Sequence, residues 1–343
     1  MQSEMKLCVI CACGEDAAAV ENFSRSLFCR AQGVRLLLCG GRDLRSEISP
    51  AGEGNEIGFV VCGDGDLAAA LNAALGRADA PLVMFSLPAV TFAPGAAERL
   101  SAGGAAVCNA AAQEKNGPRK LYRDNFIPHE AFAPAVGVNF VMRTDVLRAN
   151  GLVLRRADAL GFAALAAEYC AYDRFSAVKE VLIYGAEPVC ADAESFSETL
   201  SGMSPDAGLS ALTLLLWAYS ELSGDEKEKC FESFSTSAKP FFENEACAAY
   251  ALAAFGVDAG MLGGDCRAGD FISAGANAMY KEVTLPILAD DVVRDFYGGK
   301  LSFGTLKRSI AAWLYFKLYR MGGPAKKFGC AFCRKFIGGD LNV

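Results

Sequence analysis

Apolar runs and helical patterns alternate along the first half of the chain. Short apolar runs that predict buried strands lie at 6–12, 34–39, 57–62, 81–85, 136–143 and 178–184. Between them apolar residues recur at helical spacing, which predicts helices over 17–29, 66–77, 94–103, 144–150 and 159–172. Strands that are apolar throughout and separated by helices are typical of a parallel sheet covered on both faces. The predicted fold class is therefore α/β, with a mainly parallel sheet flanked by helices.

The segment 111–134 breaks this alternation. It is polar, shows little periodicity, and contains Gly117-Pro118 and the only histidine, His129. The composition predicts a long loop over the edge of the sheet, and long loops in such folds often carry function.

The pattern changes again after Pro188. A polar stretch, 192–201, predicts a linker, and the segments that follow it predict helices without strands over 209–222, 225–235, 241–255 and 283–296. We therefore expect three parts: an α/β domain over 1–190, a helical domain over 191–299 and a basic amphipathic tail over 300–343.

The tail carries much of the positive charge. From Lys300 onward there are nine Lys and Arg residues and one acid, whereas the whole chain has a net charge of −7. Within 302–321, apolar residues such as Trp313 and Leu318 share one helical stripe with cations at its margins. The segment 302–335 therefore predicts contact with an anionic membrane surface; the alternative is a helix docked on the protein. Because the rest of the chain is strongly acidic, nucleic acid is a poor fit as a partner.

The overall composition indicates a folded, two-domain protein. Of the 343 residues, 52% are hydrophobic and 21% are charged. No apolar run reaches the roughly 18 residues that span a bilayer, and the N-terminus does not resemble a signal peptide. We therefore expect a cytoplasmic protein, peripheral at the inner face of the membrane through its tail. The 14 cysteines are scattered through apolar runs, as expected for reduced, buried side chains. The pair Cys330 and Cys333 has no second pair at zinc-site spacing.

The order of these elements resembles the family 2 glycosyltransferases, which have a GT-A, nucleotide-diphosphosugar transferase fold. The resemblance covers the first 190 residues and rests on a series of matched positions, which are Ser26-Leu27-Phe28, Gly65, Asn72, Ala78, Pro94, Asn139 to Arg143, Gly151-Leu152, Asp158, Phe162 and Tyr184. The acidic motifs of the family are missing. Cys39 and Gly40 replace a pair of aspartates at one strand end, and Ser86, Leu87 and Pro88 replace the Asp-x-Asp motif at another.

The resemblance implies a site for a nucleotide-sugar donor. The donor-binding positions that it implies are Cys11, Cys39, Gly40, Gly65, Asn72, Ser86, Pro88 and Arg143. It also implies that Asp158 is the general base; the alternative is an acid that caps a helix N-terminus. For Asn72 the alternative is an asparagine that packs or caps its helix.

The missing acids change the expected chemistry. Paired carboxylates at a strand end hold a divalent cation that neutralises the diphosphate, and Ser86, Leu87 and Pro88 do not provide such a pair. We assign no metal ligand and no cofactor, and a role for Mn²⁺ or Mg²⁺ is doubtful. Cations would have to replace the metal, and the candidates are Arg119, Lys120, Arg123 and Arg143, with His129 as a donor to phosphate; for each the alternative is a solvated surface residue.

Two hypotheses follow. The first is a glycosyltransferase-like protein of cell-surface polysaccharide or glycan assembly, with Asp158 as base in an inverting transfer. The second is a catalytically inactive descendant of that fold, a pseudoenzyme that acts as a scaffold or partner subunit. A third and weaker hypothesis is a membrane-binding module that acts through the tail.

Overall fold

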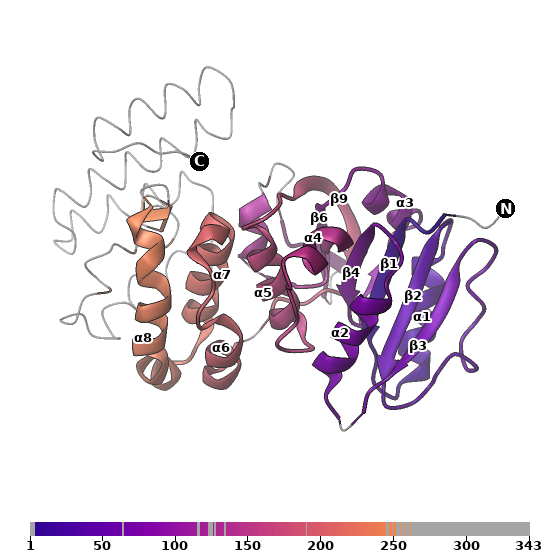
Figure 1. Cartoon of the computed structure of the whole chain (residues 1–343), viewed down its shortest axis with the longest axis horizontal. Coiled ribbons are helices and arrows are strands. Elements are labelled where there is room, and N and C mark those ends of the chain that lie inside the picture. The colour runs from indigo at the N-terminus through magenta and orange to yellow at the C-terminus, as the bar shows by residue number, and fades with distance from the viewer. Residues whose placement is uncertain are drawn as a thin grey trace, which may run out of the picture. The chain divides into compact units, whose positions relative to one another are not determined.

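The structure is a computed structural model that divides the chain into two compact units, Met1–Val189 and Cys190–Val343 (Figure 1). It describes residues 4–244, except 64, 115–116, 123–125, 127, 134 and 190, and also residues 247–248, 250–251, 255, 257 and 262. The predicted helix at 283–296, the tail at 300–343, and Cys330 and Cys333 lie outside the described residues.

The first unit is built on one mixed sheet with helices on its faces (Figure 1). Its strand order is β3-β2-β1-β4-β8-β6-β9-β5, and β7 pairs with β6. The strands are β1 (Leu7–Ala12), β2 (Val34–Gly40), β3 (Glu56–Val61), β4 (Leu82–Ser86), β5 (Thr91–Phe92), β6 (Ala106–Glu114), β7 (Gly117–Lys120), β8 (Phe140–Arg143) and β9 (Ser176–Tyr184). The helices are α1 (Ala17–Leu27), α2 (Leu67–Arg77), α3 (Ala96–Ser101), α4 (Thr144–Ala149), α5 (Ala159–Tyr169) and a short 3-10 helix, η1 (Pro128–Phe132).

The strands β3, β2, β1 and β4 form a parallel half-sheet. The chain runs from β1 through α1 to β2 in one direction, and from β3 through α2 back to β4 in the other. Because such crossovers share one hand, the two helices cover opposite faces of the sheet. Cys39 on β2 donates a hydrogen bond from its Sγ to the Ala70 carbonyl of α2, which identifies the face that α2 covers.

The other half of the sheet is mixed. Strand β8 lies antiparallel to both β4 and β6, and β9 runs parallel to β6. The predicted fold class is confirmed in this unit, because a sheet with a parallel half carries helices on its faces and a helical region follows it in the chain.

The segment around 111–134 differs from the prediction. Instead of one long loop, β6 extends through Glu114 and forms a hairpin with β7, in which Ala111 pairs with Lys120. The β6 sequence contains three consecutive alanines and an asparagine, which favour strands weakly. Pairing with β8 and β9 on its two sides decides its conformation, and that pairing is not visible in the local sequence.

The described part of the second unit is helical. It contains α6 (Ala193–Leu200), α7 (Gly208–Glu221) and α8 (Gly224–Ala238), together with the short 3-10 helices η2 (Pro205–Ala207) and η3 (Lys239–Glu243). The predicted linker at 192–201 is wrong: it forms α6, because Asp192 and Ser195 cap its first turn reciprocally while Phe196 and Leu200 are buried. No described helix has the length and apolar character needed to span a bilayer.

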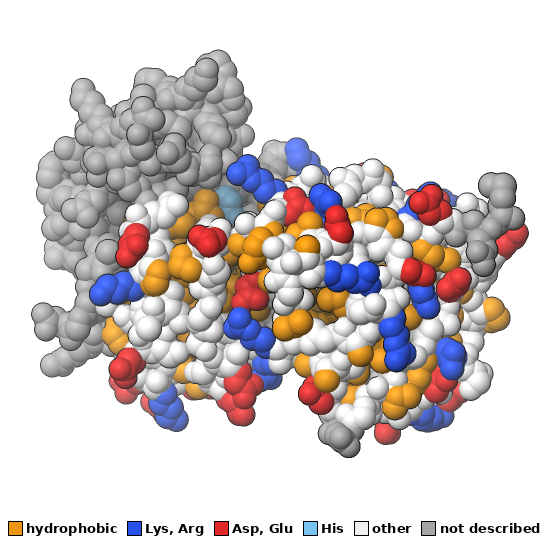
Figure 2. All heavy atoms as spheres, viewed as in Figure 1, with side chains coloured by type: hydrophobic (Ala, Val, Ile, Leu, Met, Phe, Trp, Pro, Cys, Tyr) orange, Lys and Arg blue, Asp and Glu red, His pale blue; other side chains and the backbone are white. Residues whose placement is uncertain are grey.

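Charged side chains of both signs are distributed over the described surface. In Figure 2 the Lys and Arg side chains lie among Asp and Glu side chains on the face that is shown. Several of them form ion pairs across elements, such as Arg35 with Asp79 and Arg99 with Glu180. On the described part of this face we therefore find mixed charge rather than a single-sign field.

Candidate functional site

The first unit has a topological switch point between β1 and β4. The chain leaves β1 toward β2 on one side and reaches β4 on the other, so the loops that follow these two strands diverge. In open α/β sheets, ligands bind in the crevice beyond the carboxyl ends of the strands at such a point. Cys11 and Ser86 pair directly there, in the last rung between β1 and β4.

Ser86 places a polar group without a partner in this rung. The residue has no exposed surface, and its Oγ has no hydrogen-bond partner within the part of the chain that the structure describes. Because neighbouring residues in a rung point to the same face, Ser86 and Cys11 both face the side covered by α1. An unpaired buried hydroxyl costs about 1–3 kcal/mol, so the Ser86 hydroxyl gains no stability from hydrogen bonds to the described residues.

The ends of β1 and β2 are joined by close packing around Cys13 and Gly40. The Cys13 backbone N–H and its Sγ both donate to the Cys39 carbonyl, at 2.8 and 3.2 Å. A Cβ on Gly40 would lie 2.7 Å from the Cys13 carbonyl oxygen. Glycine at this position is therefore required by the packing of two strand ends, which accounts for the absence of a larger residue there.

Burial keeps the thiols of this region protonated. It raises the pKa of Cys13 to about 11 and that of Cys39 to about 12. The pKa of Cys11 is raised well above its usual value for the same reason. These cysteines are thus small neutral side chains that line the strand ends, and none is a ready nucleophile at neutral pH.

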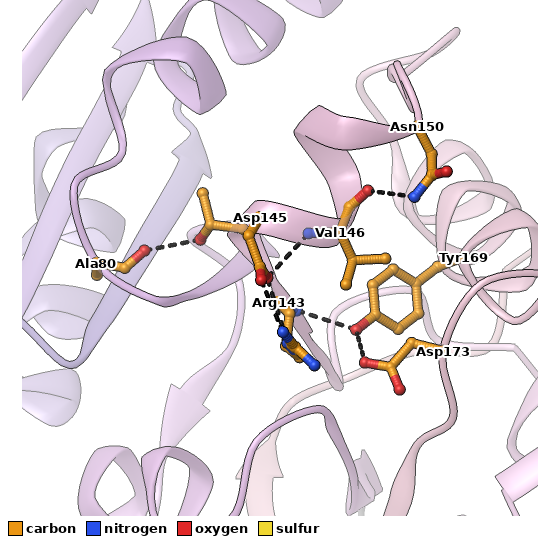
Figure 3. Close-up of polar contacts among 8 residues, drawn as sticks. Ala80, Arg143, Asp145, Val146, Asn150, Tyr169 and Asp173 are labelled. Carbon is orange, nitrogen blue, oxygen red and sulfur yellow. Dashed lines mark hydrogen bonds and ion pairs between the residues drawn. The ribbon is translucent and has the colours of Figure 1, made fainter.

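Helix α5 runs from the carboxyl ends of the parallel strands to their amino ends. Near its start, Phe162 stacks on Phe85 of β4, with ring centroids 5.6 Å apart. At its end, the Tyr169 hydroxyl accepts a hydrogen bond from the backbone N–H of Arg143 (Figure 3). Arg143 pairs with Leu82 at the amino end of β4. The N-terminus of α5 therefore lies at the carboxyl edge of the parallel strands, next to the switch point.

Asp158 caps that N-terminus. Its Oδ1 accepts from the backbone N–H of Gly161 at 2.7 Å, and its Oδ2 accepts from Nε of Arg156 at 2.9 Å. The side chain keeps 41% of its surface exposed. The structure thus gives Asp158 the capping role foreseen as an alternative, while it leaves the carboxylate accessible at the edge where a ligand would bind.

Asn72 holds another part of the chain. Its Nδ2 donates to the Leu154 carbonyl at 2.9 Å, and its Oδ1 accepts from the Leu154 N–H at 2.8 Å. These two bonds use one of the two Nδ2 hydrogens and one of the two Oδ1 lone pairs. The structure shows Asn72 in contact with the Leu154 backbone, and its contact with a donor stays a prediction.

Arg143 does not belong to the same group of residues. It lies at the amino edge of the parallel strands, and α5 spans roughly 16 Å between the two edges at 1.5 Å per residue. Its guanidinium pairs with Asp145 at 2.6 Å (Figure 3). The structure separates Arg143 from Ser86, because β8 enters the sheet antiparallel and carries Arg143 to the opposite edge. Donor binding by Arg143 stays a prediction.

Two further predicted donor-binding positions lie at the carboxyl edge, and the β6–β7 hairpin extends from the same edge because β6 runs parallel to β4. Gly65 precedes α2 with φ at +78°, and Pro88 lies in the turn that follows β4, where Val90 N–H donates to the Leu87 carbonyl. Of the loop candidates, Arg119 and Lys120 are exposed on β7, His129 is half-buried in η1, and Arg123 lies outside the described residues.

The residues at the strand ends do not fit a divalent metal. Ser86 supplies one neutral hydroxyl, and Leu87 and Pro88 supply no side-chain ligand. Across the described ranges, no three His, Cys, Asp or Glu side chains come together in a way that would hold a metal ion. A metal-dependent mechanism therefore has no basis in these residues.

The sequence pattern missed the charges that surround the edge. Arg156 lies beside Asp158, and three helices that begin there are each capped by an aspartate: Asp16 on α1, Asp66 on α2 and Asp158 on α5. Each carboxylate accepts backbone N–H groups that would otherwise attract an anion. The signal was present as an Asp directly before the predicted helices at 17–29 and 159–172, and as the first residue of the predicted helix at 66–77.

The comparisons with known proteins give structural matches alone. No protein-family model and no curated protein matches the sequence. The S. aureus TarS segment 1–349 in complex with UDP-GlcNAc aligns at 13% identity and a TM-score of 0.46, over 91% of this chain and 92% of that one. The same TarS segment without a named ligand aligns at 15% identity and a TM-score of 0.43, over 93% of this chain and 92% of that one. Its complex with UDP aligns at 14% identity and a TM-score of 0.43, with the same coverage. TM-scores this low do not establish a common fold, so the fold class stands on the strand order and register given above.

Proposed function

We propose that the first unit binds a nucleoside diphosphate sugar at the carboxyl ends of β1, β2 and β4 and transfers the sugar to a hydroxyl acceptor. The observation that carries this proposal is the switch point between β1 and β4, where Ser86 and Cys11 form the last rung. Gly40 and Gly65 keep the neighbouring strand and helix ends free of side chains. The resemblance of the element order to the family 2 glycosyltransferases supports the choice of ligand.

In this proposal Asp158 is the general base. Its carboxylate removes the proton of an acceptor hydroxyl as that oxygen forms a bond to the anomeric carbon of the sugar. The bond from that carbon to the diphosphate breaks, and the nucleoside diphosphate leaves, so the anomeric configuration inverts. The guanidinium of Arg156, 2.9 Å from Asp158, places a positive charge at the edge where the diphosphate would leave. The acceptor class, a glycan or cell-surface polysaccharide, follows from the resemblance.

A second candidate function has an observation of its own. Both oxygens of Asp158 already hold partners within the protein, and the strand ends lack acids. A protein that kept the fold but lost catalysis would have these features, and it would act as a scaffold or partner subunit.

Ligand titration separates these functions. Calorimetry with UDP and UDP-GlcNAc, with and without Mn²⁺, is expected to show binding that does not depend on the metal. Absence of heat with these and other nucleoside diphosphate sugars would contradict donor binding altogether. Binding without release of the nucleoside diphosphate, in the presence of glycan acceptors, would favour the scaffold.

The substitution Asp158→Asn tests the base, and Asp66→Asn is its matched control. Asn caps helices about as well as Asp, so both variants are expected to fold. Only Asp158→Asn removes a proton acceptor at the N-terminus of α5, and it is expected to lower kcat by a factor on the order of 10²–10⁴. Equal activity of the two variants would exclude Asp158 as the base.

A further inference from the structure

The α2 helix is joined to the chain before α5 by two side chains that contact backbone. Asn72 of α2 contacts Leu154, and Arg148 of α4 donates to the Leu75 and Gly76 carbonyls at the end of α2, at 2.7 and 3.2 Å. These contacts span long separations in the sequence. They fix the connection from α4 to α5 at two points along one helix.

We propose that Asn72 is a positioning residue, which holds Leu154 and thereby sets where Asp158 lies at the carboxyl edge. The proposal rests on the proposed function for the role of Asp158. In this proposal Asn72 acts on the site through the segment 154–158 rather than through a contact with the donor.

The geometry of the contact supports a specific pairing. The Asn72 amide meets both the N–H and the C=O of Leu154, at 2.8 and 2.9 Å, as a peptide group of a neighbouring strand would. Leu154 is 3% exposed, so a backbone group left unpaired there would lose a hydrogen bond without full access to water. The side chain length matters, because one more methylene would displace the amide from this backbone.

The segment after Leu154 connects Leu154 to the first turn of α5. Arg155 pairs with Glu168 of α5 at 2.6 Å, and Arg156 pairs with Asp158. Asp158 in turn accepts from Gly161. A Cβ on Gly161 would lie 2.2 Å from the Arg156 carbonyl oxygen, so the chain before the helix packs against its first turn. A shift at Leu154 therefore reaches Asp158 through a short and closely packed segment.

Arg148 provides the control for a role in stability alone. It joins α4 to the end of α2, about one helical turn beyond Asn72. Arg148→Ala and Asn72→Ala each remove hydrogen bonds between α2 and the chain before α5. Only Asn72→Ala removes the contact with Leu154. A purely structural role predicts that the two variants behave alike once their stability is matched.

The test uses the full chain with Asn72→Ala, Asn72→Asp and Arg148→Ala. Hydrogen exchange is followed at the Leu154 and Gly161 amides, and UDP release from UDP-GlcNAc gives kcat and KM. In Asn72→Ala both amides are expected to exchange faster, and kcat is expected to fall by roughly tenfold to a hundredfold with KM within about twofold. Arg148→Ala is expected to leave both amides and kcat close to those of the unaltered protein.

Asn72→Asp adds a signature that depends on pH. The carboxylate keeps the acceptor for the Leu154 N–H but sets a second acceptor against the Leu154 carbonyl. Protonation restores a donor, so slow exchange of the Leu154 amide, corrected for intrinsic rates, is expected to return at acidic pH.

Two results would overturn the proposal. One is unchanged exchange at Gly161 in Asn72→Ala, and the other is an equal loss of kcat in Asn72→Ala and Arg148→Ala at matched stability. If the unaltered protein releases no UDP from any donor, the transferase function fails. In that case the Gly161 amide alone decides whether Asn72 positions the cap: faster exchange in Asn72→Ala but not in Arg148→Ala supports it, and equal exchange contradicts it.

Discussion

The aromatic rings of Phe85 and Phe162 stack with centroids 5.6 Å apart, and this contact joins the end of β4 to the first turn of α5. Phe85 directly precedes Ser86, and Phe162 lies one helical turn after Asp158. Both rings are 1% exposed. The stack therefore links the two residues on which the proposed site depends, although Ser86 and Phe85 point to opposite faces of the sheet.

Removing one ring tests this link. Phe162→Ala is expected to lower the free energy of unfolding by about 3–5 kcal/mol, because it deletes a fully buried aromatic side chain. Denaturant unfolding measures the change. Tyr172→Ala is the control, since Tyr172 is 55% exposed and its loss is expected to cost less than about 0.5 kcal/mol. Similar values for the two variants would contradict the packing described.

Gly137 is required by close approach as well as by its backbone conformation. Its φ is +67°, and a Cβ there would lie 1.9 Å from the Ala159 carbonyl oxygen at the start of α5. Gly151 has a similar φ of +62° with nothing within 4 Å. Gly151→Ala is therefore expected to cost about 1–2 kcal/mol for the left-handed conformation alone, and Gly137→Ala distinctly more. Equal melting temperatures for the two variants would contradict the contact.

Ser86 and Thr144 both carry a buried hydroxyl, but removing these hydroxyls is expected to change the stability in different directions. Thr144 donates to the Ala80 carbonyl at 2.8 Å, whereas the Ser86 Oγ has no partner among the described residues. Thr144→Val is expected to destabilise the protein by about 1–3 kcal/mol, and Ser86→Ala is expected to be neutral or stabilising. If the Ser86 hydroxyl serves the ligand, Ser86→Ala also weakens UDP binding in calorimetry, while unchanged binding would remove Ser86 from the site.

Glu21 gives the first unit a dependence on pH. The carboxylate accepts from the backbone N–H and the hydroxyl of Ser49, and it pairs with Arg25, which together lower its pKa to about 2. A lowered pKa contributes stability that is present above the ordinary value near 4.5 and is lost as pH falls toward 2.

Glu21→Gln is therefore expected to lower the melting temperature at neutral pH and to flatten its decline between pH 5 and 2, in the range where the carboxyl titrates. Thermal unfolding followed by circular dichroism over this range checks both effects. Glu53→Gln, an exposed acid in the same loop as Ser49, serves as the control. A parallel pH profile for Glu21→Gln and the unaltered protein would refute the interpretation.

Alkylation distinguishes the cysteines of the strand ends from those at the surface. Burial raises the pKa values of Cys8, Cys39 and Cys108 to about 12, so these thiols are expected to react slowly with iodoacetamide at pH 8. Among the cysteines that the structure describes, Cys29 is exposed and is expected to react first. Mass spectrometry of the digested protein assigns the order, and early labelling of Cys39 would show that the ends of β1 and β2 open readily.

The sequence predicted the alternation of strands and helices because that signal is local. Runs such as 36–39 and 81–85 are apolar throughout, and an Asp precedes α1, α2 and α5. It did not predict β6, whose alanines become a strand only through pairing with distant partners. It also placed Arg143 with Ser86, because the apolar pattern of β8 carries no information on strand direction.

The resemblance grouped Cys11, Gly40 and Ser86, and the structure places these residues at the carboxyl ends of β1, β2 and β4. Their binding of a donor stays a prediction. The role of Asn72 depends on Leu154, a residue 82 positions away, and no local rule identifies such a partner. The cap formed by Asp158 was foreseen, whereas its ion pair with Arg156 was not.

The pairing of β6 with β9 has a consequence for how the protein is made. Ala106 pairs with Ser176, so a chain growing from its N-terminus completes β3, β2, β1 and β4 well before β6 can find its parallel neighbour. Long-range pairing of this kind slows folding. During synthesis β6 must be protected by its hairpin with β7, or it remains an open strand that is available to other chains.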